Sequence, residues 1–393
     1  MFSIKISELV KNGEVIIKTG PFGTQLKASE YVKMGTPVLN VKNLGYGRVV
    51  DEKLDMVGND TVERLSAHLL RTGDIVFGRK GAVERHAFIS QNEKGWMQGS
   101  DCIRLRVNSS RINPKYLSYY FLTDKHKAFM MGMCSHGTTM ASLNQKIIEQ
   151  IEVPLPSIDV QNKIVALLGC IDEKVKINEK INDNLLAQAQ TLYKQFFPYG
   201  VQDDLPDGWR IGTVGEIIEI HDSKRIPLSG ADRSKMEKKI YPYYGAASLM
   251  DLVDNYIFDG KYLLLGEDGT VVDDAGYPIL QYVWGQFWVN NHAHILTGRL
   301  GYDVESLYML FKQTPVKSIV TGAVQPKISQ ANLRSVQVVI PPEHNLREYN
   351  DLVEPLFSLF RANEEECKTF TALRDTLLPK LMSGEIDVSD VQL

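Results

Sequence analysis

The sequence has none of the features that direct a chain into a membrane or an oxidising compartment. No apolar run approaches the ~18 residues that a transmembrane helix needs. The start, Met1-Phe2-Ser3-Ile4-Lys5, lacks the apolar block and the small-residue cleavage site of a signal peptide. The four cysteines form no C-x-x-C pair, which disfavours structural zinc. We therefore expect a cytoplasmic protein that keeps its thiols reduced.

The chain also lacks a uniformly basic charge. Its net charge is −4 over 393 residues, but the segments differ: +6 for residues 1–156, zero for 157–200, −4 for 201–342 and −6 for 343–393. A protein that holds DNA unaided is usually basic throughout. If this chain binds DNA, we expect another subunit to supply much of the phosphate contact.

No complete catalytic motif is present. Asn113-Pro114-Lys115-Tyr116 looks like the Asn-Pro-Pro-Tyr loop of amino methyltransferases, but Asn followed by Pro also caps a helix start, and no glycine-rich cofactor loop accompanies it. The turn at Gly20–Gly23 lacks the Gly-Lys-Ser/Thr ending of a phosphate loop. His292 and His294 would share one face of a strand, yet no third ligand is in view. We therefore predict no catalytic residue and no metal site.

A long heptad pattern organises the chain instead. Between residues 157 and 197 apolar residues recur every seven positions, with one asparagine among them: Ile164, Ile171, Asn178, Leu185 and Leu192. The same pattern returns 185 positions later as Tyr349, Leu356, Asn363, Phe370 and Leu377. A helix of about 41 residues is roughly 60 Å long, far longer than most globular helices. The pattern predicts two long helices that pair along this seam.

The segments that precede these two helices also repeat each other. The glycine-bounded stretch Gly73–Gly81 matches Lys261–Gly269, but Arg79-Lys80 is replaced by Glu267-Asp268. Two further pairs of stretches occur in the same order, Ile4–Val10 with Ile211–Ile218 and Gly137–Gln145 with Gly322–Gln330. The scaffold is therefore repeated, whereas the chemistry of its loops is not.

This order predicts an α+β protein with an internal pseudo-twofold repeat, in which two globular α/β domains are joined by two long antiparallel coiled-coil helices. The predicted segments are a first domain at 1–156, a long helix at 157–200, a second domain at 201–342 and a long helix at 343–393. A side-chain hydrogen bond between Asn178 and Asn363 would fix the register of the helix pair at some cost in stability. The alternative is that both amides face solvent or a partner subunit.

The arrangement resembles the specificity subunit of type I restriction–modification enzymes, in which two target recognition domains are each followed by a long helix. The resemblance covers essentially the whole chain. It rests on local patterns such as Gly20–Lys27 and the helix ends Leu192–Phe197 and Leu377–Met382. The order of these patterns, duplicated at nearly constant spacing, is the specific signal.

The resemblance implies a non-catalytic subunit that reads a bipartite, asymmetric target on double-stranded DNA, one half with each domain, while the helices set the gap. It implies two modification subunits near the helices, which carry S-adenosylmethionine and methylate adenine, and motor subunits that cleave unmodified DNA. No cofactor is expected in this chain. Two other classes stay open, a self-contained methyltransferase or nuclease and a coiled-coil scaffold that binds only proteins.

Candidate DNA-reading residues are those on predicted loops that can hydrogen-bond to base edges in the major groove. In the first domain these are Lys18, Gln25, Lys27, Arg79, Lys80 and Arg85. In the second domain they are Lys224, Arg225, Arg233, Lys235, Asn290 and His292. Glu267 and Asp268 either accept from cytosine amino groups or face water. For about half of the set, a solvated charged loop is the alternative interpretation.

Overall fold

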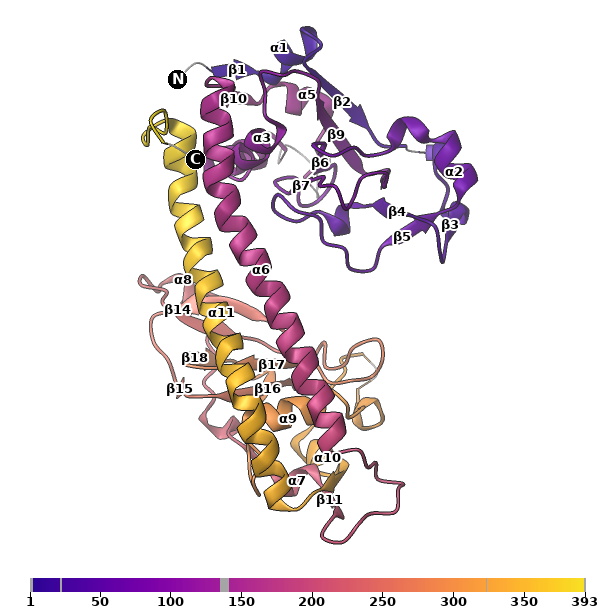
Figure 1. Ribbon diagram of the computed structural model, residues 1–393, viewed down its shortest axis with the longest axis vertical. Helices are drawn as coiled ribbons and strands as arrows, with labels where there is room; N and C mark the ends of the chain where they lie inside the picture. The colour runs from indigo at the N-terminus through magenta and orange to yellow at the C-terminus, as the bar shows by residue number, and fades with distance from the viewer. Residues whose placement is uncertain (1–2, 22, 135–140, 323, 392–393) are drawn as a thin grey trace. The chain divides into compact units, whose positions relative to one another are not determined.

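The computed structural model describes the chain except for short stretches, and its course is drawn in Figure 1. The described residues are 3–21, 23–134, 141–322 and 324–391. Residues 137–140 of the predicted Gly137–Gln145 loop lie outside them. Within the described ranges, no helix is both long and apolar enough to cross a bilayer.

Contacts between residues divide the chain into two compact units. Unit 1 comprises Met1–Lys176 and Glu366–Leu393, and unit 2 comprises Ile177–Glu365. Each unit therefore contains one globular domain together with parts of both long helices. The finer division at residues 156, 200 and 342 stays a prediction.

Unit 1 contains a mixed α/β domain. Its elements are β1 (Ser3–Lys5), α1 (Ile6–Lys11), β2 (Val15–Thr19), β3 (Tyr31–Val32), β4 (Thr36–Leu39), β5 (Asp55–Val57), α2 (Asn59–Arg64), β6 (Ile75–Gly78), β7 (His86–Phe88), β8 (Met97–Gln98), β9 (Cys102–Val107), α3 (Pro114–Tyr120), α4 (Asp124–Cys134), α5 (Gln145–Glu149) and β10 (Glu152–Pro154), followed by α6 (Ile158–Phe196). Among the described residues its strands pair in the orders β1-β10, β2-β9-β6-β7 and β3-β5-β4-β8.

The β2-β9-β6-β7 sheet and helix α3 form the main core of unit 1. Strand β6 is buried at every position because it lies between β7 and β9. Helix α3 starts where the sequence predicts, since the Asn113 side chain accepts from the backbone N–H of Lys115 at 2.9 Å and Pro114 occupies the first turn. The Asn-Pro pair is therefore a helix start.

Unit 2 contains the second domain. Its elements are β11 (Arg210–Thr213), α7 (Val214–Ile217), β12 (Ile218–Ile220), α8 (Gly230–Ser234), β13 (Tyr241–Tyr244), β14 (Leu249–Val253), β15 (Phe258–Asp259), β16 (Tyr262–Gly266), β17 (Leu280–Val283), β18 (Gln286–Val289), β19 (Ala293–Gly298), α9 (Val304–Phe311), α10 (Gln330–Arg334) and β20 (Gln337–Ile340), followed by α11 (Glu343–Ser383). Its described strands pair in the orders β11-β20, β12-β19-β16-β17 and β14-β13-β18-β15.

The two domains repeat one topology, which confirms the predicted α+β class and internal repeat. The sheets β2-β9-β6-β7 and β12-β19-β16-β17 correspond strand by strand, and Gly78 faces Cys102 as Gly266 faces Ala293. The third sheets share a parallel pair, β4 with β8 and β13 with β18, but differ at one edge. Strand β3 lies beside β5 in unit 1, whereas β15 lies beside β18 in unit 2.

The two long helices pack antiparallel within each unit. In unit 1, Arg374 Nη1 lies 3.3 Å from Asp172 Oδ1, and Lys174 pairs with Glu366 at 3.1 Å. In unit 2, the Tyr349 hydroxyl donates to the Ala189 carbonyl at 3.1 Å. Residue numbers fall along α11 as they rise along α6, which is the predicted antiparallel orientation.

An asparagine pair lies between the helices in unit 2. The Asn363 amide donates to Oδ1 of Asn182 at 2.9 Å, one turn beyond Asn178, which is also buried. The Asn182 amide donates in turn to Glu364 Oε1 at 2.8 Å. Sequence reasoning passed over Asn182 because it does not lie on the strict seven-residue row. The role of Asn178 and Asn363 in setting the register stays a prediction.

Candidate nucleic-acid interface

The turn after the central buried strand has the same backbone in both units and opposite chemistry. Gly81 and Gly269 adopt positive φ angles of 78° and 84°, a conformation that favours glycine. In unit 1 the turn carries Arg79, whose backbone N–H donates to the Asp101 carbonyl at 2.8 Å, and Lys80, whose side chain is exposed. The backbone bond orders the turn and leaves the Lys80 ammonium accessible.

Other candidates in unit 1 lie on exposed loops. Gln25 and Lys27 follow β2, and the loop is held by Arg64, whose guanidinium donates to the Gln25 carbonyl at 2.7 Å. Arg85 is exposed and lies over the Tyr46 ring at 5.4 Å. The side chains of Gln25, Lys27 and Arg85 are therefore accessible to a ligand, and the Arg64 contact holds the backbone at Gln25.

Lys18 is tied to its own domain. It lies in β2 opposite Arg104 of β9, and its ammonium donates to the Ala67 carbonyl at 3.1 Å. Desolvation, followed by the charges of Arg104 and Arg106, lowers the pKa of Lys18. A contact between Lys18 and DNA would have to compete with this internal hydrogen bond.

In unit 2, basic side chains neutralise the acidic turn. Glu267 pairs with Arg225 at 2.7 Å and with Lys327 at 3.2 Å. Asp268 contacts Nδ1 of His292 at 2.5 Å. This pairing reduces the repulsion that two adjacent carboxylates would exert on a phosphate backbone. Asp268 also leaves Nε2 as the His292 nitrogen that faces away from the turn.

A buried hydrogen-bond network lies beneath this turn. His294 is fully buried, and its Nε2 donates to the Ile328 carbonyl at 2.8 Å while Nδ1 faces Asp222 Oδ2 at 2.6 Å. Asp222 also accepts from the Ile295 N–H at 3.0 Å and from the Gln330 amide at 2.6 Å. Burial acts to raise the pKa of Asp222, but the hydrogen bonds from His294 and Ile295 hold it below its usual value. The network joins the turn after β12, strand β19 and the start of α10.

Ligand atoms of Asp222, Glu267 and His294 lie within 4.8 Å of one another, a spacing at which such groups can hold a metal ion. However, the Arg225 guanidinium lies between the carboxylates, 3.3 Å from Asp222 and 2.7 Å from Glu267. Both nitrogens of His294 also face protein oxygens. The protein's own cations thus satisfy the cluster, so we interpret it as a structural ion network.

Three candidate DNA-reading residues of the second domain form ion pairs or hydrogen bonds within the domain. Arg225 is largely buried in the ion network. Arg233 donates to the Leu228 carbonyl at 2.7 Å and lies over the Tyr243 ring at 4.9 Å. Asn290 is 4% exposed and accepts from the backbone N–H of His292 at 2.8 Å. These contacts disfavour base reading by the three side chains.

Of the three remaining candidates of the second domain, the two lysines lie on one basic segment, whereas His292 lies beside Asp268. Lys224 and Lys235 are exposed, and Lys238, which the sequence analysis missed, is exposed beside them. Residues 224–239 contain six basic and two acidic side chains, although residues 201–342 carry a net charge of −4. Counting charge over a short window would have identified this segment. It is the part of unit 2 best suited to phosphate.

One anchoring contact is common to both units. The Gln145 amide donates to the Thr19 hydroxyl at 2.9 Å, and the Gln330 amide donates to Asp222 at 2.6 Å. Each glutamine is the first residue of the last short helix of its domain and joins that helix to the end of β2 or to the segment just after β12. The repeated scaffold thus fixes where the loops lie, and the side chains on them differ.

A family model described as the type I restriction modification DNA specificity domain matches residues 5–187 and again residues 206–366. The chain belongs to this family. The two matches coincide with the duplicated fold, so the protein is a DNA specificity subunit of a type I restriction–modification system.

Known specificity subunits resemble the chain over most of its length. It is 22% identical over 362 residues to the type I restriction enzyme MjaIX specificity subunit of Methanocaldococcus jannaschii, covering 84% of this chain and 81% of that one. It is 20% identical over 378 residues to the putative MjaX specificity subunit of the same organism, covering 91% and 88%. The crystal structure of the S subunit from M. genitalium has the same fold, with a TM-score of 0.55, 16% identity, and coverage of 97% and 96%.

Proposed function

We propose that this specificity subunit reads a bipartite, asymmetric sequence on double-stranded DNA, with one half read by the loops of each unit. The observation that carries the proposal is the repeated turn that bears Arg79 and Lys80 in unit 1 and Glu267 and Asp268 in unit 2. Arginine and lysine donate to guanine, whereas the carboxylates of the unit 2 turn are paired with Arg225, Lys327 and His292 of the same unit. The same turn therefore carries different charged groups in the two units, as expected if the two units read different half-sequences.

The proposal includes two modification subunits that bind along the helices in the cytoplasm. These subunits carry S-adenosylmethionine and methylate adenine. Restriction subunits join them where the system also cleaves DNA. Apolar side chains exposed on the helices support a protein partner there. Leu352 and Leu359 are each 48% exposed and Leu373 is 43% exposed. Catalysis belongs to the partners in this proposal, and the acidic second half of the chain leaves phosphate neutralisation largely to them.

Sequencing of methylated adenines in cells with and without this gene tests the proposal. We expect one bipartite, asymmetric motif to disappear with the gene and to return when the gene is restored. The lost motif would give both half-sequences and the spacer. An unchanged pattern in cells that express active modification subunits would contradict the proposal and favour a scaffold that binds only proteins.

Replacing the basic turn of unit 1 by its acidic counterpart should change one half-sequence only. In the double variant Arg79→Glu with Lys80→Asp, donors become acceptors, so binding to the native first half should weaken by about 5- to 150-fold, the range of one good base contact. Competition binding by the complex with modification subunits, against duplexes altered in either half, measures the effect. Lys11→Glu, an exposed charge reversal at the end of α1, is the control.

Lengthening both helices should lengthen the unread spacer. Seven residues inserted after Lys176 in α6 and after Glu365 in α11 add about 10 Å to each helix, which corresponds to about three base pairs. We expect the half-sequences to stay unchanged and the affinity to fall, because DNA must also twist to present both halves. Methylation sequencing reads the new spacer. An altered half-sequence would count against the helices as a spacer ruler.

A further inference from the structure

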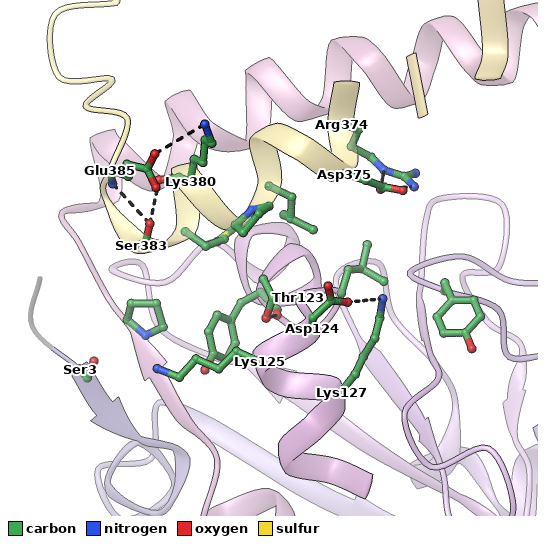
Figure 2. Close-up of a pocket in the computed structure, with 17 residues that line it drawn as sticks. Ser3, Thr123, Asp124, Lys125, Lys127, Arg374, Asp375, Lys380, Ser383 and Glu385 are labelled. Atoms are coloured by element: carbon green, nitrogen blue, oxygen red, sulfur yellow. Dashed lines mark hydrogen bonds and ion pairs between the residues drawn. The ribbon is translucent and has the colours of Figure 1, made fainter. Parts of the chain in front are cut away.

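Unit 1 contains a cleft at the C-terminal end of α11, shown in Figure 2. Its volume is about 990 Å³. One wall is the last turns of α11 with the residues after them, and the other is the junction of α3 and α4. Ser3 and Pro154, from the paired strands β1 and β10, lie at one end.

The cleft combines an apolar floor with a charged rim. Tyr120, Leu378 and Met382 line it and are almost completely buried. The rim carries the cations Lys125, Lys127, Arg374 and Lys380.

The cations of the rim differ in what they contact. Lys127 lies 3.4 Å from Asp124, and Lys380 lies 3.6 Å from Glu385. Lys125 has no ion-pair partner among the residues that the structure describes. An occupant with both an apolar group and negative charge would use the floor and the rim together.

In unit 2, an aromatic side chain packs on the residue that corresponds to Met382 of the cleft. With the helices aligned by their heptads, Met382 corresponds to Phe197, and with β1 aligned on β11, Ser3 corresponds to Ile211. Trp209 immediately precedes β11, and its ring packs on Phe197 at 6.2 Å and on Tyr199 at 5.0 Å. An aromatic side chain therefore packs on Phe197, the counterpart of the cleft residue Met382, and stands two residues before Ile211, the counterpart of Ser3.

The segment that supplies Trp209 is acidic. Residues 198–209 contain three aspartates, Asp203, Asp204 and Asp207, and no lysine or arginine. The rim of the cleft in unit 1 carries four cations against three carboxylates, and Lys127, Arg374 and Lys380 are already ion-paired. Such a segment would therefore meet its charge partner chiefly at Lys125.

We propose that this cleft is a docking site for an acidic segment of a partner protein that inserts one aromatic side chain between α4 and the end of α11. The apolar floor disfavours a DNA backbone as the occupant, because a phosphate chain has no apolar group to place on it. Docking at this site is independent of base reading, so its failure would leave the proposed DNA recognition intact.

The probe is a fluorescein-labelled peptide with the sequence of residues 197–209, titrated with the full chain and followed by anisotropy. We expect saturable binding that needs both features of the peptide. Replacing its tryptophan by alanine should weaken binding at least tenfold, since the aromatic group fills the floor. Replacing its three aspartates by asparagine should weaken it about fivefold, because the rim charges are partly solvated.

Variants of the chain locate the binding. Ser383 is exposed in the cleft, and Ser383→Trp should block peptide binding by filling it. Lys125→Glu should weaken binding about threefold to fivefold, whereas Lys11→Glu, the same charge change outside the cleft, should have no effect. Absence of saturable binding up to about 1 mM, equal binding by Ser383→Trp, or displacement of the peptide by non-cognate duplex DNA at low micromolar concentration would each overturn the proposal.

Discussion

Unit 1 is expected to lose most of its stability between about pH 6.5 and pH 4.5, because two histidines are buried in its aromatic core. His86 and His126 are 0% and 1% exposed. Their rings pack around Phe121, with centroid distances of 5.8 Å and 4.7 Å. His86 Nε2 contacts the Ser118 hydroxyl at 2.9 Å, whereas both ring nitrogens of His126 are without a hydrogen-bond partner in the described structure.

Burial lowers the pKa of each ring to about 3, with a further contribution at His86 from His126 and Lys115 and at His126 from Lys127. The unfolded chain, with a pKa near 6.5, therefore binds more protons than the folded chain over this interval. The stability associated with the neutral rings is complete above about pH 6.5 and is lost as the pH falls toward 3. At pH 4.5 the two rings together cost roughly 5 kcal/mol, comparable to the whole stability of many domains.

His126→Phe should move the acid-unfolding midpoint of unit 1 to a lower pH. Phenylalanine preserves the ring packing and cannot be protonated, and at neutral pH it should also stabilise the unit by about 1–3 kcal/mol, since it removes buried unpaired nitrogens. Denaturant unfolding at pH 7 and pH 5, with hydrogen exchange in β6 and α3 to identify unit 1, measures both effects. His344→Phe, at an exposed position in unit 2, is the control. An unchanged acid midpoint in His126→Phe would contradict the explanation.

The features that the sequence predicted are those determined by local pattern. Apolar residues repeated every seven positions form a seam along which two helices pack. An Asn or Asp before a helix caps its first turn, as Asn113 and Asp303 both do. The change from Arg79-Lys80 to Glu267-Asp268 is likewise visible in the sequence, because the glycines around it are repeated.

The sequence does not reveal which charged side chains form ion pairs and hydrogen bonds inside the fold. Lys224 and Arg225 are neighbours and look alike as DNA contacts, yet Lys224 is exposed while Arg225 neutralises a buried carboxylate cluster. The pairing of β12 with β19 brings His294 beside Asp222, and the fold brings Glu267 beside Arg225. Ion pairs between residues far apart in the sequence produce no periodic pattern. The structure is therefore needed to separate the exposed DNA-reading candidates from those that pair inside the fold.

Glu305 is a buried charge that no sequence pattern predicts. It lies in the first turn of α9, two residues after the Asp303 cap, and is 0% exposed. Its Oε1 accepts from Lys261 at 2.6 Å, from the Tyr282 hydroxyl at 2.7 Å and from Arg361 at 3.1 Å. Because Arg361 belongs to α11, this carboxylate joins the second domain to the helix within unit 2.

Glu305→Ala should lower the free energy of unfolding of unit 2 by about 3–5 kcal/mol, since two cations and a hydroxyl would lose their common partner in a partly buried site. Glu354 contacts the same two cations, Lys261 at 3.4 Å and Arg361 at 2.7 Å, but its side chain is 47% exposed. Glu354→Ala is therefore the matched control and should cost less than about 1 kcal/mol.

Glu305→Ala should weaken recognition of only one of the two half-sequences. A domain that is no longer fastened to α11 presents its loops less precisely, so discrimination in the half-sequence read by unit 2 should weaken, while the half read by unit 1 should keep its selectivity. Denaturant unfolding and binding to duplexes altered in each half separate the two effects. Glu305→Gln retains an oxygen acceptor for Tyr282 and should fall between the wild type and Glu305→Ala. Equal stability of Glu305→Ala and Glu354→Ala would mean that the buried carboxylate does not hold the domain to the helix.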